Sequence, residues 1–332
     1  MQKYYLDLIE TIISYLLTTG IIITTLFSLA GYWQKGIIFE LISHFKIQYF
    51  VISLILLLCL AIIGEKRLLF IGIFCTVINL TPILPWYINQ NSISQETPNL
   101  RILVHNIYGG RNDRYSQITE MVKAENPDIA IFLEATNIWL QKLQTLSDTL
   151  PYSIYAQSSS EIIVIYSKFP LNNYSIEFFA PERATIITEF KINQKVINLI
   201  ATHPTVPIKV STFQKRNQIL EELAKYIQQL NNPVILGGDL NITMWSPYYQ
   251  KLEQETGLRN TRLGFGILPT WPGKGFSKSI VFYILSRFFQ IPIDHCLISS
   301  EIKVVNVETK ANLSSKLGSD HIPIIADLFI SK

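Results

Sequence analysis

The chain has 332 residues, of which 48% are hydrophobic and 16% are charged, and its mean hydropathy is +0.26. Soluble domains carry roughly 25% charged residues, so this composition excludes an ordinary soluble protein. The net charge of +3 is too small to indicate a nucleic-acid partner, and we expect none. The three cysteines, Cys59, Cys75 and Cys296, provide neither a disulfide framework nor a cysteine metal site, and they do not indicate a compartment.

Three uncharged, mostly apolar stretches open the chain, at positions 11–33, 47–64 and 68–87. Each approaches or exceeds the roughly 18–20 residues that cross the hydrocarbon core of a bilayer. A cleaved signal peptide is the alternative for the first stretch, but the run is long and two more follow it. Buried helices of a soluble core are the alternative for the other two. We predict a transmembrane region over residues 1–90 with three helices, whose ends carry the interfacial aromatic residues Tyr32, Trp33, Trp86 and Tyr87.

Basic residues beside the three stretches predict the orientation of the chain. With three crossings, Lys3, Lys66 and Arg67 share the side of the amino terminus, and Lys35 and Lys46 lie on the opposite side. Cytoplasmic segments tend to be the more basic ones, so residues 88–332 are expected outside the cytoplasm.

Residues 88–99 are polar and lack helical periodicity, which is typical of a linker. These twelve residues reach at most about 40 Å when fully extended. The part of the chain that follows is therefore expected to stay close to the lipid surface.

From Leu100 onward, short apolar runs alternate with amphipathic segments, which predicts one mixed α/β domain over residues 100–332. Helices are expected at 115–125, 137–147 and 211–230. The strands between residues 152 and 202 read as one antiparallel meander, with Asn193-Gln194 as a tight hairpin turn. Strands are expected at 101–107, 129–133, 152–157, 161–166, 183–192, 196–202, 233–236, 291–299 and 322–330.

Polar residues stand where several of these strands end. Gly237 and Gly238 are expected to close one strand in a tight turn, directly before Asp239 and Asn241. Residues two apart in an extended chain point to the same side, and α/β sheets bind their ligands at the carboxyl ends of strands. A polar turn that only caps the strand is the alternative.

The other strand ends carry a set of acids, amides and imidazoles: Asn106, Glu134, His203, Asp294, Asp320 and His321. Carboxylate and amide oxygens without thiolates suit Mg²⁺ or Mn²⁺ better than zinc. Such a cation polarises a phosphoryl oxygen, a carboxylate orients or deprotonates water, and imidazoles donate to the developing charge. The set therefore indicates phosphoester hydrolysis. Taken singly, Glu134 has a salt bridge or helix cap as its alternative, and His203 has a structural role.

In this order the residues resemble the endonuclease/exonuclease/phosphatase superfamily, which includes pancreatic deoxyribonuclease, inositol-polyphosphate phosphatases and bacterial sphingomyelinases. The resemblance covers roughly residues 100–330 and implies a four-layer α/β/β/α sandwich, here preceded by three transmembrane helices. Two positions depart from the usual pattern, because Leu133 replaces a glutamine and Ser160 or Glu161 replaces a glycine. The motifs are Asn106 and Glu134 after strands, Thr202-His203, Gly238-Asp239-Leu240-Asn241, Ile293-Asp294-His295 and Ser319-Asp320-His321.

The resemblance implies a metal site and a base. Glu134 would be the principal ligand of Mg²⁺ or Mn²⁺, with Asn106 and Asp320 helping to complete the site. Asp239 would position or activate the attacking water, and Asn241 would orient Asp239 or the phosphate.

It also implies groups that bind the phosphate. His321, held in its tautomer by Asp294, would donate to the phosphoryl group, and His203 would stabilise it from the other side. Arg183 is a candidate phosphate clamp, with an ordinary surface arginine as the alternative, and Trp271 is a candidate substrate-binding residue.

The apolar stretches, together with Thr202-His203-Pro204 and Pro269-Thr270-Trp271-Pro272, resemble the membrane-anchored branch that includes VanJ-type glycopeptide-resistance proteins. That branch implies a multi-pass protein of the bacterial plasma membrane, with an extracytoplasmic catalytic domain and a polyprenyl pyrophosphate or related lipid phosphate as substrate. A membrane-anchored nuclease and a non-catalytic membrane scaffold are the alternatives. The basic, aromatic residues 273–290 either lie in the membrane interface or pack as a helix on the domain's own core.

Overall fold

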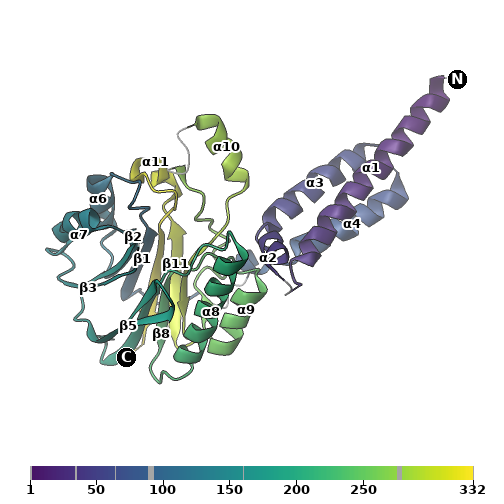
Figure 1. Ribbon diagram of the computed structural model, residues 1–332. Coiled ribbons are helices and arrows are strands. Elements are labelled where there is room, and N and C mark those ends of the chain that lie inside the picture. The colour runs from purple at the N-terminus through teal and green to yellow at the C-terminus, as the bar shows by residue number, and fades with distance from the viewer. Residues whose placement is uncertain are drawn as a thin grey trace. The chain divides into compact units, whose positions relative to one another are not determined.

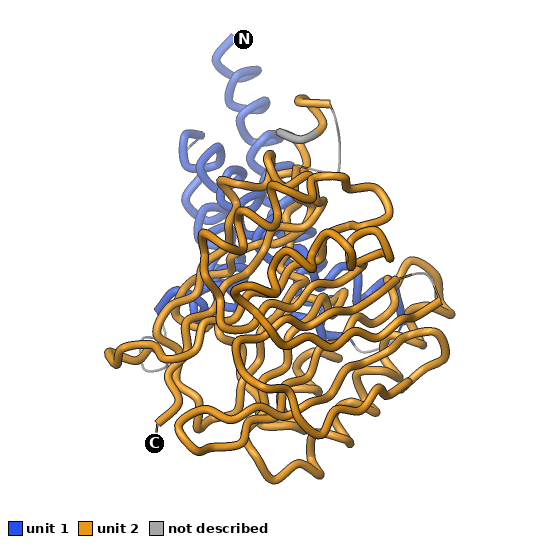
Figure 2. The backbone as a smooth tube through the Cα atoms, turned by 90° about the vertical axis from the view of Figure 1, so that its left-hand side faces the viewer, with its two compact units in different colours: residues 1–88, 245–247 blue, residues 89–244, 248–332 orange. Residues whose placement is uncertain are grey.

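The computed structural model describes residues 2–33, 36–63, 65–88, 93–159, 161–274 and 279–331. The chain divides into two compact units, which Figure 2 distinguishes by colour: residues 1–88 with 245–247, and residues 89–244 with 248–332. Several predictions fall outside the described residues: those on Lys35, Gly64, Ser160, linker residues 89–92 and the part of the 273–290 segment that contains Phe276 and Lys278.

The first unit is helical (Figure 1). Among the described residues, two of its helices are long and apolar enough to cross a membrane, α1 with 29 residues and α3 with 18. Ile21, Leu60, Leu68 and Cys75 form a small buried cluster between α1, α3 and α4. The helices are α1 (Gln2–Ala30), α2 (Ile37–Ser43), α3 (Lys46–Ile63), α4 (Lys66–Leu80) and α5 (Pro85–Ile88).

The third predicted span, residues 68–87, is not one continuous helix, and this prediction is corrected. α4 has 15 residues and ends at Leu80, and α5 begins only at Pro85. Pro82 and Pro85 lack the backbone N–H that would continue the helical ladder. Fifteen residues rise about 22 Å, which is less than the roughly 30 Å core of a bilayer.

The second unit is built on two six-stranded sheets. The first sheet has the order β11-β12-β1-β2-β4-β3, and the second has the order β5-β6-β7-β8-β10-β9. β1 and β2 run parallel, as do β7 and β8, and the remaining neighbours are antiparallel. The first sheet comprises β1 (Leu100–Asn106), β2 (Ile129–Ala135), β3 (Tyr152–Gln157), β4 (Ile162–Ser167), β11 (Ile302–Thr309) and β12 (Ile324–Ile330). The second comprises β5 (Asn172–Ala180), β6 (Arg183–Ile192), β7 (Lys195–Thr202), β8 (Val234–Asp239), β9 (Arg259–Asn260) and β10 (Asp294–Ile298).

The predicted meander is wrong as a single sheet, because β3 and β4 belong to the first sheet and β6 and β7 to the second. Its hairpin turn is confirmed: Asn193 and Gln194 have φ values of 51° and 68°, and β6 and β7 pair on either side of them. The prediction missed β5, β9 and β11. β5 escaped detection because it is a largely exposed edge strand without a continuous apolar run.

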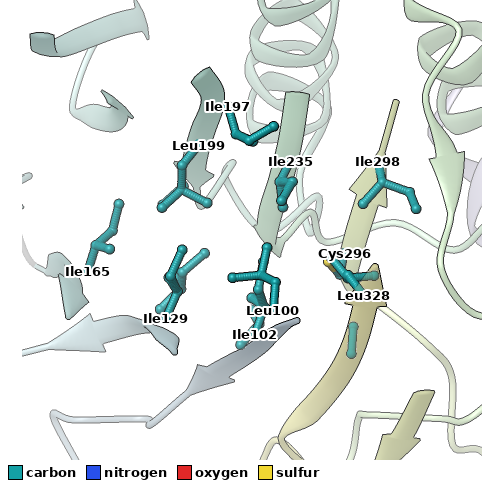
Figure 3. Close-up of a cluster of buried hydrophobic side chains, with 14 of the residues drawn as sticks. Leu100, Ile102, Ile129, Ile165, Ile197, Leu199, Ile235, Cys296, Ile298 and Leu328 are labelled. Carbon is teal, nitrogen blue, oxygen red and sulfur yellow. The ribbon is translucent and has the colours of Figure 1, made fainter. Parts of the chain in front are cut away.

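Aliphatic side chains from both sheets form the core between them (Figure 3). In β1, Leu100, Ile102 and Val104 face the opposite sheet, while Leu103 faces outward, as the two-residue repeat of a strand requires. Loop residues Phe169, Leu171, Phe265 and Leu268 pack against this core, and Ile93 forms a bridge with Val304.

Helices cover the outer faces of the sheets. α6 (Tyr115–Glu125) and α7 (Asn137–Leu143) pack on the first sheet through a second cluster that includes Trp139 and Phe132. α8 (Val210–Ile227) and α9 (Pro247–Thr256) lie on the opposite side of the sandwich (Figure 1). This is the four-layer α/β/β/α order that was predicted. The remaining helical elements are α10 (Ile280–Phe288), α11 (Ser314–Leu317) and the 3₁₀ turns Gln144–Leu146 and Ala311–Leu313.

The sheet topology places all the predicted site residues at one edge of the sandwich. Asn106, Asp239 and His203 stand at the ends of β1, β8 and β7. Antiparallel partners begin where these strands end, so Asp294 opens β10 opposite Asp239. His321 precedes β12, whose first residue pairs with Val104 near the end of β1. The directions and pairing of the strands therefore bring these site residues together.

Candidate active site

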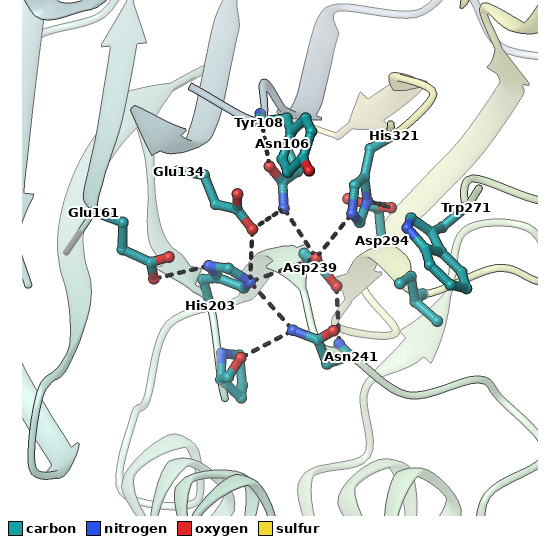
Figure 4. A network of polar contacts seen from close by, with 12 residues as sticks. Asn106, Tyr108, Glu134, Glu161, His203, Asp239, Asn241, Trp271, Asp294 and His321 are labelled. Atoms are coloured by element: carbon teal, nitrogen blue, oxygen red, sulfur yellow. Dashed lines mark hydrogen bonds and ion pairs between the residues drawn. The ribbon is translucent and has the colours of Figure 1, made fainter. Parts of the chain in front are cut away.

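Asp239 is the centre of the polar cluster at this edge (Figure 4). Its Oδ2 accepts a hydrogen bond from Asn106 Nδ2 at 3.1 Å, and its Oδ1 accepts one from the Asn241 backbone N–H at 2.9 Å. The Nε2 atoms of His203 and His321 lie 3.5 Å and 3.6 Å from Asp239 Oδ2. One carboxylate therefore stands between two imidazoles.

Each imidazole is held from behind by a second carboxylate. His203 Nδ1 donates to Glu161 Oε1 at 2.8 Å, and His321 Nδ1 donates to Asp294 Oδ2 at 2.8 Å. This orientation leaves both Nε2 atoms directed at Asp239 (Figure 4). Asn241 Nδ2 lies 3.2 Å from His203 Nε2 and donates to the Pro204 carbonyl at 3.0 Å.

Burial and charge act in opposite directions on these groups. Burial alone would lower the pKa of His321, but the Asp294 and Asp239 carboxylates raise the pKa to about 10. Burial likewise opposes the charge on His203, yet Glu161 and Asp239 raise the pKa of that imidazole well above its usual range. Burial would raise the pKa of Asp239, but His321 and His203 lower it overall. These opposite charges favour the ionised form of Asp239 and the protonated forms of the two imidazoles.

Carboxylates near Asp239 suit a divalent cation. Oxygen or nitrogen atoms of Glu134, His203 and Asp239 all lie within 4.8 Å of one another. Burial, reinforced by the negative charge of Glu134, raises the pKa of Asp320 to about 6. Asp320 Oδ1 is buried and makes no hydrogen bond. Such an orphaned carboxylate oxygen beside Glu134 fits a cation, and oxygen donors favour Mg²⁺ or Mn²⁺ without identifying the ion.

Asn106 is oriented differently from the predicted metal ligand. Its Nδ2 donates to Glu134 Oε1 at 2.9 Å as well as to Asp239, and its Oδ1 accepts from the Tyr108 N–H at 3.1 Å. An amide nitrogen cannot bind a cation, so in this arrangement Asn106 joins the two carboxylates instead of coordinating a metal. A ligand role would require the amide to turn over.

Glu161 is a member of the site that sequence reasoning missed. It directly precedes β4 and accepts hydrogen bonds from both His203 and Arg183. Arg183, the predicted phosphate clamp, is thus engaged with Glu161 in the structure. The available signal was an acid next to the fully apolar run Ile162–Tyr166, the mirror image of Glu134 after Ile129–Leu133. Because the family pattern has a glycine near this position, Glu161 was interpreted only as its replacement.

Trp271, the candidate substrate-binding residue, lies beside Asp320, one of the candidate metal ligands. Its indole Nε1 donates to Asp320 Oδ2 at 3.4 Å, and its backbone pairs with Ile291. Ser319 ties the same region to β1, because its hydroxyl donates to the Asn106 carbonyl at 2.7 Å and accepts from the His321 N–H at 2.9 Å.

The two glycines before Asp239 do not form the predicted tight turn, since both lie within β8. A Cβ at Gly238 would lie 2.0 Å from the Thr202 carbonyl oxygen, and one at Gly237 would lie 2.6 Å from Ile131 Cδ1. The glycines therefore allow β8 to approach β7 and the opposite sheet. Strain appears at two site residues instead, because Glu134 and Asn241 have φ values of 55° and 52°.

His295 supports the loop that carries Asn241. Its Nε2–H donates to the buried Ile242 carbonyl at 2.7 Å, and its Nδ1 accepts from Asn260 Nδ2 at 3.0 Å. Burial, aided by the charge of Arg262, lowers the pKa of His295 to about 3. The imidazole is therefore neutral in the folded protein, with both nitrogens used.

We expect His295→Phe to destabilise the protein by about 1–3 kcal/mol at pH 7.5, because the buried Ile242 carbonyl loses its donor. An unfolded histidine binds a proton below a pH of about 6.5, whereas folded His295 does so only near pH 3. Its contribution is therefore complete above pH 6.5 and declines as the pH falls. Thermal unfolding at pH 7.5, 6 and 5 should show the gap between wild type and variant narrowing. A gap that is independent of pH would contradict this account.

Two stacked sheets with acids and imidazoles at one edge define a DNase I-like phosphoesterase fold and site. The sequence profile described as Endonuclease/Exonuclease/phosphatase family matches residues 103–321. The chain belongs to this family.

Solved structures share the fold at low sequence identity. TDP2 from D. rerio, complexed with a single-strand DNA product, has a TM-score of 0.59 and 16% identity, covering 69% of this chain and 98% of that chain. An endonuclease/exonuclease/phosphatase from Beutenbergia cavernae has a TM-score of 0.56 and 16% identity, covering 70% and 72%. A mannosyl-6-phosphatase from Bacteroides thetaiotaomicron has a TM-score of 0.52 and 16% identity, covering 70% and 100%. No curated protein matches the chain in sequence.

Proposed function

We propose that the chain is a divalent-cation-dependent hydrolase that cleaves a phosphoester or pyrophosphate bond of a membrane lipid phosphate, such as a polyprenyl pyrophosphate. The observation that carries the hydrolytic part is the ionised Asp239, held between His203 and His321 beside Glu134 and Asp320. This arrangement supplies an acceptor for water and donors for a phosphoryl group within one cluster.

In this proposal, Asp239 accepts a hydrogen bond from the attacking water and orients it toward phosphorus. The Asn241 N–H and the Asn106 amide fix the direction of the Asp239 carboxylate. The raised pKa values of His321 and His203 favour their protonated forms, whose Nε2–H groups would donate to phosphoryl oxygens. Asp294 and Glu161 hold the two rings and stabilise their charge.

Glu134 and Asp320 are the residues that would hold the cation, Mg²⁺ or Mn²⁺. When bound, the cation supplies positive charge that neutralises a phosphoryl oxygen. Arg183, through its ion pair with Glu161, positions the Glu161–His203 pair, and Trp271, which donates to Asp320, would contact the substrate.

A lipid substrate is supported by the rest of the chain. α1 and α3 are candidate membrane spans, and the linker that ends at β1 limits how far the catalytic unit can move from them. We propose a multi-pass protein of a bacterial plasma membrane, in the VanJ-like branch. An extracytoplasmic catalytic unit is supported by the resemblance to that branch alone, because the orientation expected from the basic residues assumed three crossings and α1 and α3 give two. The similar fold of the DNA-bound TDP2 makes a nuclease the second candidate, but the net charge of +3 does not favour nucleic acid. A non-catalytic scaffold would not need the gathered acids and imidazoles.

The test is phosphate release by the full chain, purified in detergent with Mg²⁺. We expect release from a polyprenyl pyrophosphate or a lipid monophosphate in mixed micelles and no nicking of plasmid DNA under the same conditions. Nicking without release from either lipid would favour the nuclease. Inactivity toward all three substrates, by a protein that binds Mg²⁺ and is folded, would contradict the proposal.

A further inference from the structure

Among the side chains that the structure describes, those of α10 include exposed apolar residues and one buried polar residue. Ile280, Val281 and Leu285 are 59%, 64% and 61% exposed, and Phe282 and Phe288 are 49% and 39% exposed. Ser286, in contrast, is only 7% exposed. The alternative of a helix packed on the domain's own core through its apolar residues does not fit these exposures, because the buried position is a serine.

Three of the exposed residues form a stripe. At 100° per residue, Val281, Leu285 and Phe288 lie within about 60° of one another around the helix axis. Ser286 lies at least about 100° from each of them. A surface helix of a soluble domain normally turns its apolar stripe inward, whereas this stripe of α10 is exposed. An exposed apolar stripe marks a surface that contacts an apolar phase.

The residues before and after α10 are hydrogen-bonded to each other beside the active site. The Trp271 N–H donates to the Ile291 carbonyl at 3.0 Å, and Gln290 Nε2 donates to the Pro272 carbonyl at 2.7 Å. Trp271 also contacts Asp320, and Asp294 follows Ile291 by three residues. The helix projects from the same end of the unit as α11 (Figure 1). Whatever α10 contacts is therefore brought next to the catalytic cluster.

We propose that α10 docks on the interfacial region of a lipid bilayer and inserts the stripe formed by Val281, Leu285 and Phe288. A bilayer is favoured over a second copy because the same chain carries the candidate membrane helices α1 and α3. Residues 89–99, which connect the helical unit to β1, span at most about 40 Å when fully extended, which limits how far the catalytic unit can move from those helices. Exposed Arg287 on another side of the helix suits phosphate head groups, and phenylalanines with leucine suit the acyl boundary.

Docking would bring the phosphate of a lipid to Asp239 while the lipid stays in the membrane. This part of the inference, which names the substrate, rests on the proposed function. The docking itself does not, so the two can fail separately. Val281 and Leu285 are exposed and are not part of the catalytic cluster, so they are the positions chosen for substitution.

The docking test places a fluorophore on α10 of the full chain. Leu285→Cys, in a Cys59→Ser background that leaves only buried native cysteines, is labelled with an NBD dye and reconstituted in phosphatidylcholine/phosphatidylglycerol vesicles. We expect doxyl-labelled lipid to quench the dye at least twofold. The matched control is the exposed Lys225→Cys on α8, which should not be quenched. Equal quenching at both positions, no quenching at position 285, or energy transfer between copies without quenching would overturn the proposal.

A second variant separates docking from catalysis. Val281→Glu/Leu285→Glu should reduce hydrolysis of a vesicle-borne lipid phosphate about tenfold and leave hydrolysis of a water-soluble phosphoester unchanged. The control is Lys225→Glu, which should alter neither rate. An equal loss on both substrates, or no loss on vesicles, would overturn the role of α10. If wild type hydrolyses neither substrate, the proposed function fails, and the quenching result alone still decides whether α10 docks.

Discussion

Asp239→Asn is expected to lower phosphate release by about 10³-fold while the protein remains folded. The amide is nearly isosteric, but it carries no charge and accepts water's proton poorly. It also removes the negative charge that faces His203 Nε2 at 3.5 Å and His321 Nε2 at 3.6 Å. Steady-state rates at saturating lipid phosphate and Mg²⁺, with circular dichroism of each sample, measure the effect.

The control for this substitution is Asp148→Asn, which changes an exposed carboxylate outside the cluster and should leave the rate unchanged. A variant at position 239 that retains more than a tenth of wild-type activity would show that Asp239 is not the group that orients water. A variant that fails to fold would be replaced by Asn241→Ala, which removes the amide near His203 and leaves the carboxylate in place.

Removal of the cation is the second large effect. Chelation should abolish hydrolysis, and Mg²⁺ or Mn²⁺ should restore it. Glu134→Gln should raise the Mg²⁺ concentration needed for half-maximal rate by about 10²-fold, since even outer-shell partners of metal ligands change affinity by 10–100-fold. Binding of a cation at 100 times its dissociation constant stabilises the folded state by about 2.7 kcal/mol. The thermal midpoint of the wild type should therefore rise with Mg²⁺.

Glu134→Gln can be compared directly with the wild type, because the thermal midpoint of this variant should rise only at a much higher Mg²⁺ concentration. Glu182→Gln, an exposed carboxylate next to Arg183, serves as the matched control and should behave as wild type. Undiminished hydrolysis after exhaustive chelation would contradict metal dependence. An identical Mg²⁺ response in wild type and Glu134→Gln would place the cation elsewhere.

Much of the site could be predicted from sequence because the residues at the ends of strands can be recognised and neighbouring strands meet in few arrangements. An apolar run that ends in Asn106, Glu134 or Asp239 marks a strand tip, and parallel neighbours place their tips at one edge. The order of the motifs along the chain then indicated the family, which the match over residues 103–321 shows. Each of these inferences depends on local pattern and chain order alone.

The remainder depends on three-dimensional contacts that local pattern does not encode. Glu161 is recognisable only from its two partners, His203 and Arg183, which are distant in sequence. The orientation of the Asn106 amide follows from the Tyr108 N–H, and the glycines of β8 serve close approach instead of a turn. The assignment of hairpins to one sheet or the other also escaped prediction, since both sheets bury similar aliphatic residues.

Three of the polar pairs join one sheet to the other: Asn106 to Asp239, His203 to Glu161, and His321 to Asp294. A small slip of one sheet past its neighbour would break all of them together. The packing of the aliphatic core between the sheets opposes that slip, although these contacts have no directional bonds. One of them is the close approach of Ile131 to Gly237. Selection for turnover must therefore act on interior aliphatic residues that never meet the substrate.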